Sequence, residues 1–447
     1  MDEKTFLKEI QNRSLVIGVI GLGYVGLPVA CLLAKTGFKV IGLDVKKDRV
    51  DEINRGVSPI QGIEPGLQEL LSSVIDQGTF HATLNAEELA AADIITINVE
   101  TPVEADHKPR YVALRAACST ISKHLKKGAL IIVESTIAPG TTRNVIIPEI
   151  ENASSLVLNR DYFLGACPER VMPGKLLNNL LNMSRVCGGS TPETANVMKA
   201  LYATFVTADI NTTDIITAEV VKTAENTYRD VQIAFANEVA LICEEYGADV
   251  YEVRELVNKS PNRQMHLPGA GVGGHCIPKD PWLLVAGMPE NKPSRVIPAA
   301  RAVNESMPHH LVSQLLSMLQ KHGRKLDDSK IAVLGYAYLE NSDDTRNSPS
   351  ETLVKELEEN HAKVVINDPY VPEYMNNVYE LVAGCDATVL MVSHSDYQRL
   401  DWQKIRKLVK TPILLDGRHS IQREQALQAG FDFYCVGIGD DPNPIGK

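Results

Sequence analysis

The chain lacks the features that would place it on a membrane, a nucleic acid or a disulfide framework. No apolar run approaches the roughly 20 residues that span a bilayer, and the charged start at 1–4 lacks the apolar core of a signal peptide. Lysine and arginine form no block, and the formal net charge is −11. Eight cysteines are scattered without a CxxC pair, which is typical of a reducing compartment. We therefore expect a cytoplasmic protein that binds neither membrane nor nucleic acid.

Zinc-site spacing is also missing. The sequence has no HExxH and no paired Cys/His motif, so we expect no metal. Its 447 residues exceed one ordinary core, which predicts two or three domains. The hydrophobic share of 44% and the charged share of 23% are ordinary for a globular chain. Because the net charge is negative, an anionic substrate has to be met by locally placed cations and backbone amides.

A pattern of strand, glycines, helix, strand and acid near the N-terminus predicts a dinucleotide site. Residues 15–20 form an apolar run typical of a buried strand, and Gly-Leu-Gly-Tyr-Val-Gly follows at 21–26. A helical pattern over 27–36 and a second apolar run at 38–43 lead to Asp44. A lone G-x-G-x-x-G is weak evidence, but this whole context is strong. A purely structural glycine turn is the weaker alternative.

The residues of this fingerprint have separate expected roles. Gly21 permits the tight turn, Gly23 lets a pyrophosphate touch the backbone at the helix N-terminus, and Gly26 lets the helix pack closely on the strand. Asp44 would accept hydrogen bonds from the adenosine ribose and repel a 2′-phosphate. This favours NAD over NADP as the cofactor, although nearby cations such as Arg49 weaken that choice.

Further apolar runs predict more strands of the same sheet, at 93–99, 129–133 and 162–166. Ligands lie beyond the carboxyl ends of parallel strands. Thr101 and Thr136 follow two of these runs, so their hydroxyls could reach cofactor and substrate. Each threonine could equally be an ordinary helix cap or turn former.

Charged groups follow in the next part of the chain. Glu169 comes shortly after the run at 162–166 and adds a carboxylate near the same edge. A long helix is predicted from about 213 to about 246, and it carries Lys222 and Asn226. These two residues are four apart, so they project from one helix face. Taken alone they are a solvated lysine and an ordinary asparagine.

One glycine-rich loop holds a single cysteine and is the most informative stretch of the chain. Residues 271–281 read Gly-Val-Gly-Gly-His-Cys-Ile-Pro-Lys-Asp-Pro, with Cys276 between His275 and Asp280. Glycine lets the backbone approach a ligand closely, and a thiol beside charged groups can act as a nucleophile. Burial as a small hydrophobe is the commonest fate of cysteine, and we expect it for the other seven.

From residue 330 the pattern of the first domain returns in degenerate form. Strands are predicted at 330–335, 363–367, 385–392 and 413–415. Gly-Tyr-Ala at 335–337 stands where the first domain has Gly-Leu-Gly. We expect a second Rossmann-like sheet that binds a nucleotide differently, with Arg346 and Asp368 as candidate contacts. A purely structural domain is the alternative.

In the order of its motifs the chain resembles the UDP-glucose/GDP-mannose dehydrogenase family over nearly its whole length. The matching pieces lie at 21–26, 135–136, 168–169, 222 with 226, 273–280 and 344–346. The His before the cysteine, the Pro-Lys-Asp-Pro after it, and Pro168-Glu169-Arg170 with Pro173-Gly174 are similar to the branch that oxidises UDP-N-acetylhexosamines. The UDP-glucose enzymes carry a second glutamate where this chain has Pro173, so Glu169 has to act without that partner.

The resemblance implies an NAD-dependent, four-electron oxidation of a UDP-sugar, with UDP-N-acetyl-D-mannosamine as the expected substrate. The C-6 alcohol would become a carboxylate through an aldehyde. A thiolate from Cys276 would add to that aldehyde, and the thiohemiacetal would lose a second hydride to become a thioester. Water would then hydrolyse the thioester.

Other catalytic roles are implied in the same way. Lys222 and Asn226 would stabilise the alkoxide and tetrahedral oxyanions, since preorganised donors are strongest where charge develops. Asp280 would serve proton transfer. Glu169 would be the base for the hydrolytic water, with Thr136 orienting that water.

The resemblance also implies two sets of binding residues. The predicted cofactor contacts are Gly21, Gly23, Tyr24, Val25, Gly26, Asp44, Arg49, Thr101, Thr136 and Arg346. The predicted substrate contacts are Glu169, Arg170, Lys222, Asn226, His266, Gly273, His275 and Asp368. His275 is assigned no acid–base role, because it could shape the loop or contact the acetamido group.

Several alternatives remain open at this point. UDP-N-acetylglucosamine differs at one stereocentre, and UDP-glucose would use the same chemistry. A two-electron β-hydroxyacid dehydrogenase would share the first domain and the Lys222/Asn226 pair, but it needs no nucleophilic cysteine and no third domain. A non-catalytic nucleotide-sugar sensor would be expected to lose Cys276, Lys222 or Asp280 first.

The expected fold is α/β, with two Rossmann-like doubly wound domains joined by a central helical domain. Residues 1–205 would bind NAD, and 323–447 would bind the UDP-sugar. Residues 206–322 would hold the catalytic loop and helices at 250–258 and 298–320, and would form a homodimer interface. The last residues, 437–447, are rich in Gly, Pro and Asp and are expected to be flexible.

Overall fold

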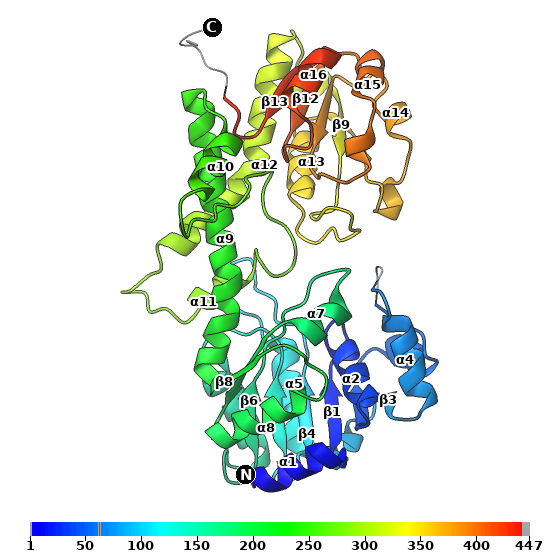
Figure 1. The fold of residues 1–447 in the computed structure, drawn as a ribbon, viewed down its shortest axis with the longest axis vertical. Helices are drawn as coiled ribbons and strands as arrows, with labels where there is room; N and C mark the ends of the chain where they lie inside the picture. The colour runs from blue at the N-terminus through cyan, green and yellow to red at the C-terminus, as the bar shows by residue number, and fades with distance from the viewer. Residues whose placement is uncertain (1, 61, 63, 440–447) are drawn as a thin grey trace. The chain divides into compact units, whose positions relative to one another are not determined.

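The computed structural model describes residues 2–60, 62 and 64–439, and it divides into two compact units (Figure 1). The first unit contains the chain up to Glu225 together with Trp282–Asn291. The second contains Asn226–Pro281 and the chain from Lys292 onward. The division falls within one long helix, α9 (Ile215–Tyr246), and the three-domain boundaries expected from the sequence stay a prediction.

An eight-stranded sheet forms the centre of the first unit, in the order β3-β2-β1-β4-β5-β6-β7-β8. Its strands are β1 (Val16–Ile20), β2 (Lys39–Leu43), β3 (Phe80–Thr83), β4 (Ile94–Ile97), β5 (Leu130–Val133), β6 (Phe163–Ala166), β7 (Arg185–Gly189) and β8 (Ile210–Asp214). Neighbouring strands are parallel except β6 and β7, which are antiparallel. The turn of direction at β7 brings its first residue to the carboxyl edge of β6.

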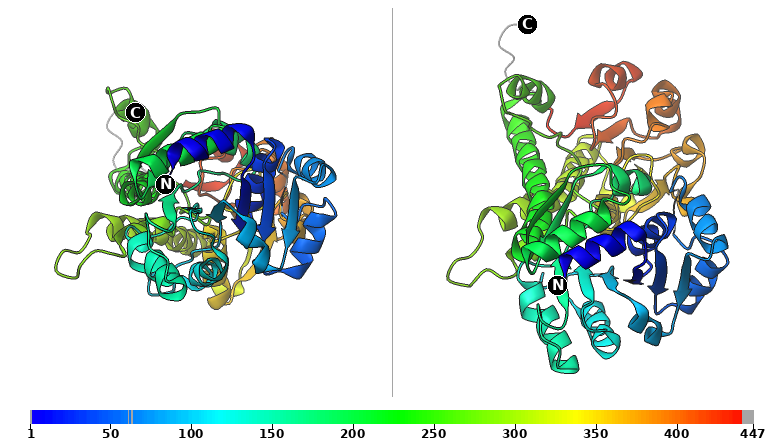
Figure 2. Two further views of the ribbon diagram at one scale, coloured as in Figure 1. Left: turned by 90° about the horizontal axis from the view of Figure 1, so that it is seen from below. Right: turned by 60° about the horizontal axis from the view of Figure 1, so that its bottom comes forward.

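Helices cover both faces of this sheet, so two separate cores form. The helices of this unit include α1 (Glu3–Asn12), α2 (Gly26–Lys35), α3 (Lys47–Asn54), α4 (Leu67–Asp76), α5 (Val112–His124), α6 (Ile147–Ser154), α7 (Leu176–Asn182) and α8 (Pro192–Tyr202). Ile17 and Val19 pack in one core with α2, whereas Ile95 and Ile97 pack in the other with α5. Strands buried on both faces explain the unbroken apolar runs in the sequence. Helix α1 lies beside α8 (Figure 2).

The second unit has a five-stranded, all-parallel sheet in the order β10-β9-β11-β12-β13. Its strands are β9 (Lys330–Leu334), β10 (Lys363–Asn367), β11 (Ala387–Leu390), β12 (Ile413–Asp416) and β13 (Asp432–Cys435). Its further helices are α10 (Val250–Asn258), α12 (Val296–Lys321), α13 (Pro349–Glu359), α14 (Val378–Leu381), α15 (Trp402–Leu408) and α16 (Arg423–Ala429). Leu311 and Leu315 of α12 share a core with Ile331 and Val333 of β9. The expected fold class, two Rossmann-like sheets with a helical block between them in sequence, is confirmed.

Two features differ from the sequence expectations. Strands β3, β7, β8 and β13 were not predicted, and β8 shows why, because most of its Ile-Asn-Thr-Thr-Asp residues are polar and exposed at a sheet edge. The expectation of a flexible end is wrong for residues 437–439. Gly437 O accepts a hydrogen bond from Val250 N (2.9 Å), and Ile438 forms a bridge with Asp249. The rest of that segment, 440–447, lies outside the described residues.

Candidate active site

The glycine turn after β1 leaves open space at one position only. Gly21 has φ +87°, and a Cβ added there would lie 2.6 Å from Asn98 O. A Cβ at Gly26 would lie 1.9 Å from Gly21 O. No atom lies within 4 Å of the corresponding point at Gly23. The N-terminus of α2 has no side-chain cap, and an uncapped helix N-terminus is suited to a pyrophosphate.

Asp44 lies at the end of β2, where a ribose is expected. Its carboxylate accepts hydrogen bonds from Leu22 N (2.8 Å), Lys46 N (2.9 Å) and Arg49 Nη1 (2.9 Å). Burial opposes ionisation, but these bonds outweigh it and hold the pKa of Asp44 below its usual range. An ionised acid next to an open glycine turn fits NAD. Tyr24, another predicted cofactor contact, donates a hydrogen bond from its hydroxyl to Glu64.

The two predicted threonines come together at the carboxyl edge of the sheet. Thr101 donates its hydroxyl to the carbonyl of Thr136 at 2.5 Å. Ser135 donates to Val99 O at 2.7 Å, which joins the same two loops. Thr101 is buried and Thr136 is half-buried. The loops after β4 and β5 are therefore fastened to each other.

Glu169 is buried in an ion pair that sequence reasoning missed. Its partner is Arg185, the first residue of β7, whose guanidinium lies over the ring of Tyr202 at 4.5 Å. The antiparallel turn of β7 brings the two residues together. The run Arg-Val-Cys-Gly-Gly at 185–189 would have been the signal, because its arginine precedes short apolar residues. Arg170 instead donates to Glu225 at 2.6 Å.

Helix α9 carries the Lys222/Asn226 pair, and Glu219 of the same helix binds the segment that follows β5. That buried carboxylate accepts hydrogen bonds from Gly140 N (2.6 Å) and Thr142 N (3.0 Å). Lys222 is 8% exposed, and within the described ranges no ion pair involves it. An ammonium buried in this way is suited to a developing negative charge.

Within the second unit, Asn226 and the cysteine loop meet through Asp280. Asn226 Nδ2 donates to Asp280 Oδ2 at 2.5 Å. The carbonyl of Cys276 accepts from the amides of Lys279 (3.1 Å) and Asp280 (2.8 Å). Cys276 is exposed, and the other seven cysteines are buried, as expected. A single turn therefore presents the thiol and fixes the carboxylate that follows it, at the start of α11 (Asp280–Val285).

Tyr338 explains two glycines of this loop, and sequence reasoning missed it. A Cβ on Gly273 would lie 2.5 Å from Tyr338 Cβ, and one on Gly274, at φ +91°, would lie 2.9 Å from its ring. Gly274 N also donates to Arg346 O at 2.8 Å, and Asn347 Nδ2 donates to Gly274 O at 3.1 Å. Packing against Tyr338 is thus a structural reason for glycine at these two positions, and the expected substrate contact of Gly273 stays a prediction.

The predicted histidines are pushed toward the neutral form. The pKa of His275 is lowered by desolvation and by the cations Lys279 and Arg346. The pKa of His266 is lowered by desolvation and by Arg229 and Arg254. Each imidazole can therefore accept a hydrogen bond at neutral pH.

Arg346 and Asp368 are both engaged by neighbours in the second unit. Arg346 forms a two-point pair with Asp344, at 2.8 and 2.6 Å. Asp368 is fully buried, and its oxygens accept from Tyr336 N (2.7 Å) and Tyr370 N (2.9 Å), among others. A substrate contact by Asp368 would require one of these bonds to open.

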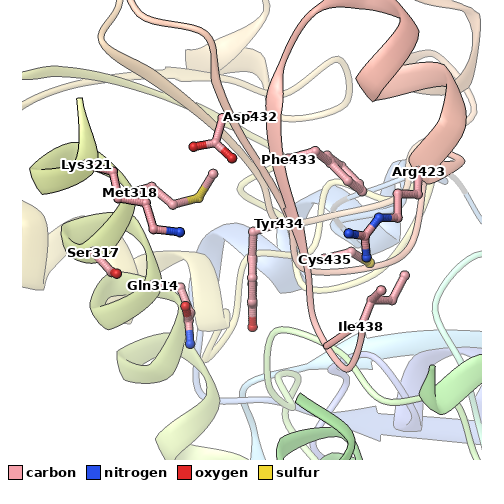
Figure 3. A pocket seen from close by; sticks show the side chains of 10 residues that line it. All are labelled: Gln314, Ser317, Met318, Lys321, Arg423, Asp432, Phe433, Tyr434, Cys435 and Ile438. Carbon is pink, nitrogen blue, oxygen red and sulfur yellow. The ribbon is translucent and has the colours of Figure 1, made fainter. Parts of the chain in front are cut away.

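A surface pocket in the second unit is lined by other residues than these. Figure 3 shows its lining of side chains from α12, α16 and β13, including Lys321, Arg423 and Asp432. None of the predicted cofactor, substrate or catalytic residues lines it. The described residues contain no cluster of three or more His, Cys, Asp or Glu that could hold a metal ion. They also contain no helix both long and apolar enough to cross a bilayer.

Family models match three successive segments of the chain. The NAD binding domain of the UDP-glucose/GDP-mannose dehydrogenase family matches residues 15–206, the central domain 216–306, and the UDP binding domain 332–423. The UDP-N-acetyl-D-mannosamine dehydrogenase of Methanocaldococcus jannaschii is 39% identical over 95% of this chain and 96% of its own length.

Among the similar proteins with solved structures are one from Pyrococcus horikoshii and one from Methanosarcina mazei. The UDP-N-acetyl-D-mannosamine dehydrogenase of Pyrococcus horikoshii is 40% identical over 95% of this chain and 99% of its own length, and its structure aligns with a TM-score of 0.90 over 95% and 100% of the two chains. The NDP-N-acetyl-D-galactosaminuronic acid dehydrogenase of Methanosarcina mazei is 34% identical, with a TM-score of 0.87 over 98% and 99%. The chain therefore belongs to the UDP-glucose/GDP-mannose dehydrogenase family and is an NAD-dependent nucleotide-sugar dehydrogenase.

Proposed function

We propose that this protein oxidises the C-6 alcohol of UDP-N-acetyl-D-mannosamine to the carboxylate, with reduction of two NAD⁺. The observation that carries the proposal is the Cys276 turn. The thiol of Cys276 is exposed, and the backbone carbonyl of the same residue accepts a hydrogen bond from Asp280 N. Asn226 in turn donates a hydrogen bond to the Asp280 side chain. The named relatives at 40% and 39% identity support the choice of sugar.

The reaction removes two hydrides from one carbon, and bound NAD supplies the acceptor for each. The first oxidation leaves an aldehyde, which does not release a hydride readily. The Cys276 thiolate forms a C–S bond to it, and the thiohemiacetal can then lose the second hydride. Hydrolysis of the thioester breaks the C–S bond and returns the thiolate. One alcohol, one water and two NAD⁺ thus give one carboxylate, two NADH and three protons.

Five residues of this chain take part in that scheme by stabilising charge, moving protons or orienting the water. Lys222 and Asn226, one turn apart on α9, donate to the alkoxide and to the tetrahedral oxyanions. Asp280 Oδ1 accepts no hydrogen bond among the described residues, although Lys279 Nζ lies 3.4 Å away. That oxygen, ion-paired with Lys279 but without a hydrogen bond, is the one to which we assign the proton transfer. Glu169 serves the later hydrolysis, with Thr136 orienting the water.

UDP-N-acetylglucosamine is the second candidate substrate, because it differs at one stereocentre only. The experiment is a comparison of initial NADH formation with UDP-N-acetylmannosamine, UDP-N-acetylglucosamine, UDP-N-acetylgalactosamine and UDP-glucose, each followed by identification of the product. We expect kcat/KM to be highest with the manno sugar, by at least tenfold. A higher kcat/KM with another sugar would make that sugar the substrate in place of the manno sugar. Absence of NADH formation with all four sugars would overturn the proposal.

We also propose a homodimer through α9. Tyr228, Phe235 and Ile242 recur every seven residues along this helix and are 65%, 57% and 49% exposed. A spacing of seven keeps them on one face, and such a stripe is self-complementary across a two-fold axis. Analytical ultracentrifugation should show a dimer for the wild type and a monomer for Phe235→Arg. The matched control is Leu427→Arg on α16, 49% exposed, which should stay dimeric.

A further inference from the structure

Three ionisable side chains form a buried cluster at the carboxyl edge of the first sheet. Glu134 follows β5, Glu169 follows β6 by three residues, and Arg185 begins β7. They are 3%, 8% and 3% exposed, respectively. The chemistry proposed above uses only Glu169, so the other two ionisable groups need an explanation.

Arg185 is held in one orientation by contacts on every side. Its Nη1 donates to Glu169 Oε1, and its Nη2 donates to Leu180 O at 3.3 Å. The guanidinium carbon lies 4.5 Å from the ring centroid of Tyr202 and 5.1 Å from that of Phe205. A planar guanidinium packed on two rings has little freedom to turn away. The carboxylate that it binds is therefore fixed as well.

The second oxygen of Glu169 remains open. Oε2 accepts no hydrogen bond within the part of the chain that the structure describes, yet it is not among the fully buried polar atoms without a partner. It is therefore the oxygen that water can reach. Arg185 binds one oxygen and leaves the other for a proton.

Glu134 is a weaker partner than Glu169 for the positive charge of Arg185. Burial raises the pKa of Glu134, although Arg185 and a hydrogen bond from Tyr202 oppose this. Among the described residues, neither Glu134 Oε2 nor Asn98 Oδ1 has a hydrogen-bond partner. A carboxyl pushed toward its neutral form leaves the positive charge of Arg185 matched to Glu169.

The other titratable groups around the cluster are neutral or directed elsewhere. Cys167 and Cys187 lie with their sulfurs 3.8 Å apart, and burial raises the pKa of the Cys167 thiol. Burial likewise raises the pKa of Tyr202. Arg170, next in sequence to Glu169, pairs with Glu225. Arg185 is thus the one charged partner of Glu169 among the described residues.

We propose that Arg185 is a positioning residue that holds Glu169 through Oε1 so that Oε2 meets the water that hydrolyses the thioester. This inference rests on the proposed function. In that step the water oxygen bonds to the acyl carbon, its proton passes to Glu169 Oε2, the C–S bond breaks, and the Cys276 thiolate leaves. Two hydrides have already been transferred, so Arg185 affects hydrolysis and not oxidation.

Rapid mixing of enzyme with UDP-N-acetylmannosamine and NAD⁺ tests this. In Arg185→Met we expect a burst of two NADH per subunit at the wild-type rate, followed by a steady state at least tenfold slower. The acid limb of the steady-state rate should move to higher pH, because loss of the neighbouring cation makes the carboxylate easier to protonate. Arg185→Lys should recover part of the rate. Arg115→Met, which breaks the exposed pair with Glu149, is the matched control and should change neither phase.

A double-mutant cycle keeps the test decisive if Arg185→Met folds poorly. Glu169→Gln with Arg185→Met removes both buried charges together, and we expect it to hydrolyse no more slowly than Glu169→Gln alone. An equal loss from Arg185→Met in both backgrounds, or a burst slowed as much as the steady state, would overturn the inference. Absence of NADH in the wild type would instead overturn the proposed function.

Discussion

The two sheets place acidic residues at the same points, and they differ in what covers them. Asp44 follows β2 and Asp368 follows β10, and each accepts a hydrogen bond from the turn after the first strand of its sheet, at 2.8 and 2.7 Å. Hydrogen bonds hold the pKa of both aspartates down against the opposing effect of burial. Glu134 after β5 and Asp416 at the end of β12 also occupy corresponding positions in the two sheets, and burial raises the pKa of each carboxyl.

The difference lies at the turn itself. In the first unit Gly23 has open space above it, and Asp44 is covered by Arg49, whose side chain is 26% exposed. In the second unit the equivalent residue is Ala337, fully buried, and Asp368 is covered by fully buried His394. Asn341 N donates to His394 Nδ1 at 2.9 Å, so Nε2 carries the proton that Asp368 accepts. The same strand–turn–acid unit is thus open to a dinucleotide in one sheet and closed in the other.

The largest expected effect separates chemistry from nucleotide binding. Cys276→Ser should lower steady-state acid formation by at least a thousandfold, because the serine hydroxyl is a far poorer nucleophile than a thiolate. NAD affinity, measured by titration calorimetry, should be unchanged, since the glycine turn is untouched. The control is Cys118→Ala, a buried cysteine of α5 that should keep activity. Normal turnover in Cys276→Ser would rule out covalent catalysis.

The two first-strand glycines should behave alike. Gly21 and Gly335 have φ +87° and +94°, and an added Cβ would lie 2.6 Å from Asn98 O and Val392 Cβ, respectively. Alanine at either should destabilise its own unit by about 2–4 kcal/mol.

Each unit holds one tryptophan, so unfolding of the two units can be followed separately. Trp282 belongs to the first unit and Trp402 to the second. Urea unfolding in Trp402→Phe and Trp282→Phe backgrounds would show which unit has lost stability. If one substitution lowered the stability of both units, the two glycine turns would not act independently.

The second turn position should separate the two sheets. Gly23→Ala meets no atom within 4 Å, so the fold should be kept within about 0.5 kcal/mol while NAD affinity falls about tenfold or more. The reverse change, Ala337→Gly, should leave NAD affinity unchanged and cost about 1 kcal/mol of stability. Equal NAD affinity in Gly23→Ala and wild type would mean that the pyrophosphate does not touch this turn.

The smallest effect concerns pH. Burial raises the pKa of Asp416 to about 6, above its ordinary 3.8. The folded state therefore binds a proton that the unfolded state has lost, and stability falls as pH rises through 6. Linkage gives a loss of about 1 kcal/mol between pH 5 and 7. Asp416→Asn should remove this slope in the Trp402 signal, and a slope that persists would point to another group.

Local patterns were predictable, and contacts between distant segments were not. The fingerprint from Gly21 to Asp44 lies within one supersecondary unit, so its spacing alone gave the strand, turn and acid. The Cys276 loop was found by composition, but Tyr338, from the loop after β9, packs on it, and no spacing encodes that contact. Arg185 was missed for the same reason, because its strand is short and pairs antiparallel with β6.

The most direct measurement is the number of NADH formed per UDP-N-acetylmannosamine consumed, with the product identified. The account predicts two NADH and one uronate from the wild type. One NADH per sugar, with an aldehyde as the final product, would contradict the cysteine-linked four-electron mechanism.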